Sequence, residues 1–434
     1  MTYANIILPL PLEGLFTYGV PDALASRVQV GVRVRVPLGK SKTYVGIVAE
    51  YPVALPASES GVVDNEKKIV YKDILEVLDA TPILLPQQLR LWRWISDYYM
   101  SPIGDVYKAA LPSGLKAEDG YRPRTELYVR LADNFRNERS LTLMIDAMKR
   151  ASKQVEVLMA YLRLAGVDGV EHLTTETPLR EVTREELMND THTTIGVIRA
   201  LSDRKLLVTY EKEVGRLNDN VLPHPEHIKP LNEAQTEAYN QILIQMMGHP
   251  VTLLHGVTSS GKTEIYIHLI QKAIDEHKQV LYLLPEIALT VQITERLKAV
   301  FGNRLGIYHS KYSDAERVEI WQKQLSAQPY DVILGARSAV FLPFQRLGLV
   351  IIDEEHEQSF KQQDPAPRYH ARSAAIVLAQ MYTGAKTLLG TATPSMETYY
   401  NAQQGKYGLV ELTRRYKDIH LPAIEVVDVK DLYR

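Results

Sequence analysis

The chain has 434 residues, of which 45% are hydrophobic and 24% are charged, and its formal net charge is −2. This length predicts two to four domains, and the nearly balanced charge gives no bulk electrostatic argument for nucleic-acid binding, which would need local basic patches. The absence of cysteine excludes disulfides and cysteine-ligated zinc or iron–sulfur centres within the chain.

The sequence shows neither a secretory signal nor a membrane span. Its first residues, Met1-Thr2-Tyr3-Ala4-Asn5, lack the basic region and apolar stretch of a signal peptide. No apolar run approaches the ~20 residues that cross a bilayer. We therefore expect a cytoplasmic protein without a membrane partner.

Residues 1–112 predict a β-rich first domain, because β-branched runs alternate with Pro and Gly. Strands are expected at residues 5–10, 31–36 and 44–51. A polar surface loop is expected at 55–68, and apolar residues at helical spacing predict a helix at 87–99.

Residues 117–216 predict a second domain. Helices are expected at 155–164, 185–188 and 193–205, with a turn at 189–192 and a strand at 206–210. Helix, turn, helix and strand follow one another in a winged helix, whose second helix lies in the major groove in DNA-binding members. Here that helix carries Arg199, Arg204 and Lys205. A role in protein contacts or in spacing other domains stays equally open.

A linker with several Pro and His residues is expected at 217–229, and from residue 230 strands and helices alternate. Strands are expected at residues 252–255, 279–284, 305–309, 331–334, 349–353 and 387–391. Such alternation predicts a parallel sheet with helices on both faces. The expected fold is thus multidomain: a β-rich N-terminal domain, a winged helix, and an α/β lobe of the P-loop NTPase class at 230–415.

The segment Gly256-Val257-Thr258-Ser259-Ser260-Gly261-Lys262-Thr263 fits the phosphate-binding pattern G-x-x-x-x-G-K-[ST]. It follows an expected strand and opens an expected helix, whose positive end would face the phosphates. Lys262 is suited to the β- and γ-phosphates and Thr263 to Mg²⁺. We predict a nucleotide site made of Gly256, Thr258, Ser259, Ser260, Gly261, Lys262, Thr263 and Glu264. The alternative is a glycine-rich turn with an ordinary surface lysine.

Two further motifs follow expected strands. Asp353-Glu354-Glu355-His356 would lie at the carboxyl end of a strand, where open α/β sheets bind ligands. Asp353 is suited to the Mg²⁺ shell, and Glu354 to orienting and deprotonating a water molecule; a solvated acidic turn is the alternative. Gly390-Thr391-Ala392-Thr393-Pro394-Ser395 is by itself only a turn with a helix cap. Gln235 is a weak candidate for bonding an adenine edge.

The order of these motifs resembles superfamily 2 helicases, and in detail it is similar to the PriA family of bacterial replication-restart helicases. The similar strings are Leu231-Asn232 with Gln235, then 256–264, 284–290, 309–310, 335–341, 353–356, 361–364, 368–372 and 390–395. The resemblance also covers the N-terminal region, through residues 8–12, 33–40 and 98–106. It implies a RecA-like first helicase lobe that uses ATP and Mg²⁺.

The segment from Lys361 to Arg372 resembles the family's aromatic-rich loop, which couples DNA binding to ATP hydrolysis. Phe360, Tyr369 and His370 would stack on bases, and Arg368 and Arg372 would lie near phosphates. The alternative is a packed loop with aromatic anchors.

The N-terminal resemblance implies a domain that binds 3′ DNA ends. Phe16, Gly39 and Lys72 would line the pocket for the terminal nucleotide, through base stacking, close backbone approach and a phosphate contact. Thr17 departs from the family, which often has an acidic residue there, so that end specificity is in question.

The chain ends at Arg434, near where a second lobe would begin, and residues 416–434 are expected to start that lobe. We therefore expect an N-terminal fragment that binds nucleotide but hydrolyses it poorly, since the family's second lobe supplies arginines. The family's zinc site, which uses cysteines in that half, is absent from this sequence.

The resemblance implies an ATP-dependent 3′-to-5′ DNA helicase that recognises stalled or abandoned forks and initiates primosome assembly. Implied partners are branched DNA with a 3′ end, single-strand DNA-binding protein and other primosome proteins. Two alternatives stay open: a fork-binding scaffold without motor activity, and a small-molecule P-loop kinase, against which the later helicase motifs argue.

Overall fold

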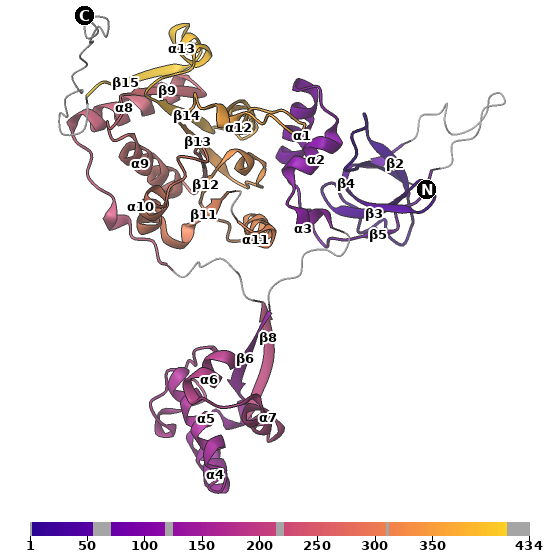
Figure 1. Cartoon of the computed structure of the whole chain (residues 1–434), viewed down its shortest axis with the longest axis vertical. Coiled ribbons are helices and arrows are strands. Elements are labelled where there is room, and N and C mark those ends of the chain that lie inside the picture. The colour runs from indigo at the N-terminus through magenta and orange to yellow at the C-terminus, as the bar shows by residue number, and fades with distance from the viewer. Residues whose placement is uncertain (1, 55–70, 118–124, 214–220, 310–311, 415–434) are drawn as a thin grey trace, which may run out of the picture. The chain divides into compact units, whose positions relative to one another are not determined.

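The structure is a computed structural model that describes residues 2–54, 71–117, 125–213, 221–309 and 312–414 (Figure 1). The chain divides into two compact units, Met1–Tyr121 with Leu217–Arg434, and Arg122–Arg216. The expected loop at 55–68 and the expected start of a second lobe at 416–434 lie outside the described residues.

The first unit begins with an antiparallel sheet of order β2-β1-β4-β3-β5. Its strands are β1 (Thr2–Ile7), β2 (Phe16–Val20), β3 (Arg33–Leu38), β4 (Lys42–Val53) and β5 (Glu76–Val77). β1, β3 and β4 were expected, with ends shifted by a few residues. β1 stops at Ile7 because Pro9 and Pro11 cannot donate to a ladder. β2 was not predicted, since its five residues contain a glycine and show no clear alternation.

Three helices follow this sheet: α1 (Pro86–Tyr98), α2 (Ile103–Ala110) and α3 (Ser113–Lys116). α1 matches the helix expected at 87–99. It starts with Pro86 at a favoured first position, and the Gln88 side chain accepts the backbone N–H of Leu85 at 2.8 Å. Its apolar side, including Trp92 and Ile95, is fully buried.

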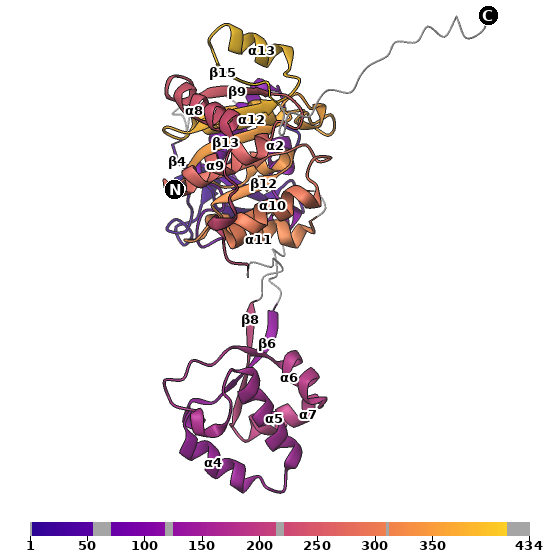
Figure 2. The ribbon, with the colours of Figure 1, turned by 90° about the vertical axis from the view of Figure 1, so that its left-hand side faces the viewer.

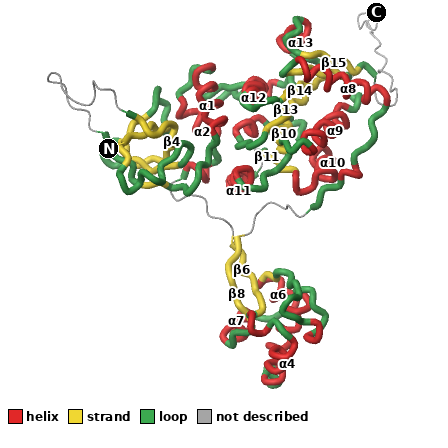
Figure 3. Tube along the Cα trace, turned by 180° about the vertical axis from the view of Figure 1, so that it is seen from behind, coloured by secondary structure: helices red, strands yellow, loops and turns green. Residues whose placement is uncertain are grey.

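The rest of the first unit is an α/β lobe, and Figure 3 shows α1 and α2 between its strands and the N-terminal sheet. In its described part, parallel strands pair in the order β11-β12-β10-β13-β14-β9-β15. The strands are β9 (Val251–Gly256), β10 (Gln279–Leu283), β11 (Leu305–Tyr308), β12 (Val332–Gly335), β13 (Leu347–Asp353), β14 (Lys386–Thr391) and β15 (Gly408–Leu412). The first six were expected, and the parallel sheet confirms the predicted fold class.

Helices cover both faces of this sheet, and Figure 2 views it from the side of α8, α9 and α10. The helices are α8 (Glu233–Gly248), α9 (Lys262–Asp275), α10 (Val291–Phe301), α11 (Asp314–Leu325), α12 (Ala371–Gln380) and α13 (Met396–Gln403). Successive strand residues point to opposite faces, as a strand requires. In β13, Leu349 and Ile351 join the core beneath α8, α9 and α10, while Val350 and Ile352 join the core beneath α12.

The N-terminal domain and the lobe share one apolar core. Trp92 and Ile95 of α1 belong to the same buried cluster as Val350 and Ile352. Polar contacts cross the same boundary, because the Trp321 indole donates to the carbonyl of Ile83 at 2.9 Å. The Asp314 carboxylate at the start of α11 also accepts the backbone N–H of Ser113 at 2.7 Å, at the N-terminus of α3.

The second unit is a winged helix. Its described strands pair in the order β7-β6-β8, and its helices are α4 (Glu138–Ala147), α5 (Ser152–Leu164), α6 (Arg184–Thr191) and α7 (Ile195–Asp203). The strands are β6 (Thr125–Leu131), β7 (Val182–Thr183) and β8 (Leu207–Glu213). α5, α6, α7 and β8 were expected, whereas α4 and β6 were not. Arg199, Arg204 and Lys205 are all exposed on this unit.

Short 3-10 turns connect these elements: η1 (Asp133–Phe135), η2 (Val170–His172), η3 (Pro225–His227), η4 (Gly302–Arg304), η5 (Arg337–Phe341) and η6 (Gln358–Phe360). No helix among the described residues is both long enough and apolar enough to cross a membrane.

Candidate nucleotide-binding site

Three motifs meet at the carboxyl edge of the parallel sheet. β13, β14 and β9 are neighbours, so that Asp353 pairs with Gly390 and Thr391 pairs with His255 across the sheet. The P-loop after β9, the acidic motif after β13 and the 390–395 turn after β14 therefore lie side by side. This edge is where open α/β sheets bind their ligands.

The P-loop needs its glycines for two different reasons. Gly261 has a φ of +82°, a conformation that other residues rarely adopt, and a Cβ there would fall 2.3 Å from Nε2 of Gln235. A Cβ at Gly256 would fall 3.1 Å from Oγ of Ser260 and press on the Lys262 side chain. Helix α9 begins at once with Lys262, so its N-terminal N–H groups face this loop.

The P-loop side chains fit a polyphosphate. Ser260 is 2% exposed, and within the described part of the chain its hydroxyl oxygen has no hydrogen-bond partner. Such an orphaned group is costly unless a ligand satisfies it. Lys262 is also buried and donates to the carbonyl of Gly256 at 2.9 Å, a neutral acceptor that a phosphate oxygen would outcompete.

Gln235 supports the P-loop from the start of α8. Its amide oxygen accepts the backbone N–H of Asn232 at 3.0 Å, and its nitrogen donates to the carbonyl of Gly261 at 3.2 Å. Both ends of the amide are therefore occupied by protein in this structure. The contact with an adenine edge stays a prediction, and it would require Gln235 to exchange one of these partners.

Asp353 is largely enclosed by protein. The hydroxyls of Tyr266 and Tyr282 donate to its carboxylate at 2.9 and 3.4 Å. Burial, with a smaller contribution from the Glu354 charge, raises the pKa of Asp353 to about 6, although Lys262 nearby opposes this. Because burial destabilises the charged form of this carboxyl group, a cation bound beside it would stabilise that form. With the hydroxyl of Thr263 in the first turn of α9, it is a set of oxygen donors that suits Mg²⁺.

Glu354 combines a strained backbone with a partly exposed side chain. Its φ of +48° lies in the left-handed region, where a side chain with a Cβ is strained, and such strain concentrates at functional sites. Its carboxylate remains about one third exposed and lies 3.7 Å from Nδ1 of His356. That ring is 2.8 Å from the Thr391 hydroxyl and 3.4 Å from the Thr393 hydroxyl, which links the acidic motif to the 390–395 turn.

The sequence interpretation gave no role to Glu355. It is fully buried, and its carboxylate accepts the backbone N–H of Ser395 at 2.7 Å and the hydroxyl of Thr398 at 3.0 Å. Arg372 pairs with the same carboxylate. The prediction that Arg372 lies near phosphates stays a prediction, and in this structure its guanidinium pairs with Glu355. No spacing rule in the sequence connects these two residues.

The segment after the acidic motif is a packed loop with aromatic anchors. Phe360 and Tyr369 are each 1% exposed, and the Tyr369 ring packs edge-on against Phe341 at 5.0 Å. The expectation that these two rings stack on bases is corrected, because neither offers a free face. Arg368 is exposed, and His370 is half-buried. Burial lowers the pKa of His370 to about 4, so its ring is neutral at physiological pH.

Two of the predicted 3′-end residues come together in the N-terminal domain. The Lys72 ammonium donates to the carbonyl of Gly39, whose φ is +69°. No described atom lies within 4 Å of where a Gly39 Cβ would be, which leaves room for close approach. The Thr17 hydroxyl donates to the Asn5 side chain at 2.8 Å. Phe16 is half-buried against the core of the sheet.

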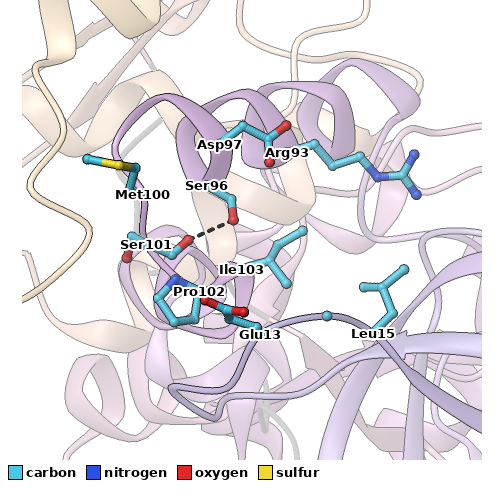
Figure 4. Close-up of a pocket in the computed structure, with 10 residues that line it drawn as sticks. Glu13, Leu15, Arg93, Ser96, Asp97, Met100, Ser101, Pro102 and Ile103 are labelled. Atoms are coloured by element: carbon cyan, nitrogen blue, oxygen red, sulfur yellow. Dashed lines mark hydrogen bonds between the residues drawn. The ribbon is translucent and has the colours of Figure 1, made fainter.

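A polar chain leads from Thr17 to a pocket beside α1. Figure 4 shows the residues that line this pocket. The Asn5 amide donates to Glu50 at 2.8 Å, and Arg93 pairs with the same carboxylate at 2.6 Å. The pocket has a volume of about 460 Å³, and the Ser96 hydroxyl donates to the Ser101 carbonyl at 2.7 Å in its wall. It is lined by Glu13, Gly14, Leu15, Arg93, Ser96, Asp97, Met100, Ser101, Pro102 and Ile103, all from the N-terminal domain.

Three known domain families match consecutive parts of the chain. The 3′ DNA-binding domain of PriA matches residues 5–112, and the winged helix domain of PriA helicase from Bacteroidota matches 126–214. The DEAD/DEAH box helicase domain matches 232–402.

Curated relatives named replication restart protein PriA match almost the whole chain. The protein of Haemophilus influenzae is 35% identical over 99% of this chain and 54% of its own length. That of Bacillus subtilis is 31% identical over 100% and 58%, and that of Chlamydia trachomatis 34% identical over 95% and 52%. The chain thus spans about half the length of these relatives.

Among solved structures, RecG bound to a three-way DNA junction is 23% identical over 43% of this chain and 24% of that chain. The TM-score of this match is 0.32.

Proposed function

The chain belongs to the PriA family of replication restart proteins, and from this premise we propose that it forms the fork-binding and nucleotide-binding part of an ATP-driven DNA helicase. We further propose that this helicase moves 3′ to 5′, recognises stalled or abandoned forks and initiates primosome assembly. The proposal depends on the family and on the chemistry of the described residues together.

One observation carries the nucleotide half of the proposal: the P-loop, the acidic motif and the 390–395 turn follow three adjacent strands. Bound ATP would supply the driving energy through its terminal phosphoanhydride. In this chain, Ser260 and Lys262 would bind the phosphates, and Thr263 with Asp353 would hold Mg²⁺. Glu354 would orient a water molecule and accept its proton.

The DNA half of the proposal rests on the N-terminal domain. Lys72 and Gly39 lie together with open space beside Gly39, which suits a phosphate near the end of a strand. Phe16 is only partly buried, and its ring would stack on a terminal base. Thr17, already bonded to Asn5, would read the 3′ hydroxyl less strictly than a carboxylate would. The winged helix would add contacts through Arg199, Arg204 and Lys205.

Protein partners follow only from the family. We propose single-strand DNA-binding protein and other primosome proteins as partners, and the bacterial cytoplasm, at the nucleoid, as the place of action.

The first test is fluorescence anisotropy of the chain on two model forks that differ only in a free or a blocked leading-strand 3′ hydroxyl. We expect tighter binding to the free end, lost in Phe16→Ala and Lys72→Ala. Lys153→Ala, which removes an exposed lysine of the winged helix, is the matched control and should keep the preference. Equal binding to both forks would refute end recognition.

Polarity and motor activity are tested with the protein as it occurs in the cell, on duplexes that have a 3′ or a 5′ single-stranded tail. We expect ATP-dependent unwinding from the 3′ tail only, abolished by Lys262→Ala. Fork binding without ATPase activity under any of these conditions would favour a scaffold instead.

A further inference from the structure

Four polar side chains form one continuous chain on a face of the N-terminal sheet. Asn5 on β1 lies directly opposite Thr17 on β2 and Glu50 on β4, and these three strands are neighbours. Side chains opposite one another on neighbouring strands point to the same face of a sheet. The pairing of β1 with β4 shifts on both sides of Asn5, and such irregularities re-aim a side chain. Arg93, on α1, pairs with Glu50 at the far end of the chain.

Each link of this chain has a fixed direction. Arg93 has donors only, and it donates to Glu50 at 2.6 Å. The Glu50 carboxylate has acceptors only, so it can bond Asn5 only through the amide nitrogen, which donates at 2.8 Å. The amide oxygen of Asn5 is thereby turned toward Thr17, and it accepts the Thr17 hydroxyl at 2.8 Å. The single proton of the Thr17 hydroxyl is therefore used within the protein.

A hydroxyl whose proton is used in this way presents only lone pairs to a ligand. Thr17 is partly exposed, so these lone pairs are open to a group bound beside β2. The group that fits must donate a hydrogen bond, as a hydroxyl does. A methylated oxygen or a hydrogen in its place has nothing to donate. Thr17 thus accepts with a neutral oxygen, where a carboxylate would accept with a charged one.

The proposed site for the end of a DNA strand lies along the same strand of the sheet. Phe16 directly precedes Thr17, and the backbone N–H of Gly19 donates to the carbonyl of Lys72 at 2.9 Å, so the segment with Lys72 runs beside β2. The Lys72 ammonium donates in turn to the carbonyl of Gly39. Contacts between described residues therefore join Thr17 to the three residues that would hold the terminal nucleotide.

We propose that Asn5 and Glu50 are positioning residues that make Thr17 an acceptor for the 3′ hydroxyl of a bound strand. The ligand is a nucleic-acid end that can donate a hydrogen bond from its 3′ position. The pair of Glu50 and Arg93 is partly exposed and adds little to stability, but it fixes the order of donors and acceptors. This inference rests on the proposed function, since it concerns how the 3′-end site named there selects its ligand.

Glu50→Gln tests the order of the chain with an almost isosteric change. Arg93 would take the amide oxygen of the new side chain, so that the amide nitrogen would donate to Asn5. Asn5 would then turn its own oxygen to position 50 and its nitrogen to Thr17. The Thr17 proton becomes free for the ligand, and the variant thus converts Thr17 from an acceptor into a donor.

The readout is fluorescence anisotropy of the chain on forks whose leading strand ends in a 3′ hydroxyl or a 3′ methoxy group. Both oxygens accept a hydrogen bond, but only the hydroxyl donates one. We expect the wild type to bind the hydroxyl end about three- to tenfold tighter, as one neutral hydrogen bond implies. In Glu50→Gln the ratio of the two Kd values should fall severalfold, and the steric effect of the methyl group cancels in this comparison. Affinity for a third fork, with a 3′ hydrogen, should change less than twofold.

Three further variants complete the experiment. Asn5→Leu releases the Thr17 proton by a different route and should lower the same ratio. Thr17→Ser keeps the hydroxyl and should keep the ratio, whereas Thr17→Val should bind the 3′-hydroxyl and 3′-hydrogen ends equally. Asp22→Asn is the matched control for the lost charge, because Asp22 is an exposed carboxylate of the same domain, and it should behave as the wild type.

Each other outcome has a defined meaning. A wild-type ratio in Glu50→Gln or in Asn5→Leu overturns the role of that residue and leaves 3′-end recognition intact. An equal loss of affinity for all three ends in these variants also overturns the inference, because a structural defect then accounts for the loss. A wild type that binds hydroxyl and hydrogen ends equally refutes end recognition itself, and this inference with it.

Discussion

Replacing Asp353 with Asn should make the ligand-free protein more stable, by an amount that grows with pH. The folded protein raises the pKa of Asp353 from 3.8 to about 6, chiefly through burial. A carboxyl whose pKa is raised by folding contributes stability below its unfolded pKa, and that contribution is lost as pH rises through the folded value. Asn keeps the acceptor for the Tyr266 hydroxyl but has no charge to bury.

The size of this stability gain follows from the difference between the two pKa values, at about 1.4 kcal/mol per pKa unit. Relative to the wild type, Asp353→Asn should gain about 1 kcal/mol at pH 4.5 and about 3 kcal/mol at pH 7.5. These are upper values, because the side chain keeps partial contact with water.

The assay is urea unfolding followed by tryptophan fluorescence, in EDTA and without nucleotide, at several pH values. All three tryptophans, Trp92, Trp94 and Trp321, lie in the unit that contains Asp353, so the signal is specific to that unit. Asp275→Asn, at an exposed position of α9, is the control, and it should show no gain in stability that increases with pH. A stability difference that is flat or falls between pH 4.5 and 7.5 would refute the burial argument.

The remaining predictions concern the same edge of the lobe. Lys262→Ala should abolish binding of a fluorescent ATP analogue while fork affinity stays within twofold; retained analogue binding would contradict the P-loop assignment. Ser260→Ala should leave ligand-free stability unchanged or raise it by up to about 1 kcal/mol, because it removes an orphaned hydroxyl, and should weaken analogue binding by about three- to tenfold. Glu355→Ala should cost about 3–5 kcal/mol of unfolding free energy, because Arg372 is left buried and unpaired, and adding Arg372→Met should recover much of it. If the double variant is no more stable than Glu355→Ala, the ion pair is not the source of the loss.

Much of the lobe was predictable, because six of its described strands, β9 to β14, are apolar runs, and those of the site end in motifs with their own chemistry. The P-loop and the Asp353 motif can each be recognised from residues that are adjacent in sequence. The alternation of strands and helices predicts that their strands are parallel. That these strands are also adjacent, which brings the motifs together, depends on topology and not on any local pattern.

What could not be predicted depends on contacts between distant residues. Phe360 and Tyr369 look like exposed aromatic ligands for bases until the fold places them against the core. Glu355 looks like one more carboxylate of an acidic turn until Ser395, Thr398 and Arg372 converge on it. β2 and α2 are too short for their periodicity to stand out from the surrounding sequence.

The apolar core shared by the N-terminal domain and the lobe has a consequence for synthesis on the ribosome. The buried faces of α1 and of α12 belong to one cluster but are about 280 residues apart in the chain, and the winged helix lies between them in the sequence. At translation rates of roughly 5–20 residues per second, Trp92 and Ile95 emerge tens of seconds before the strands and helices that cover them. The nascent chain thus exposes the apolar face of α1 while the winged helix folds. A chaperone would be needed during this interval.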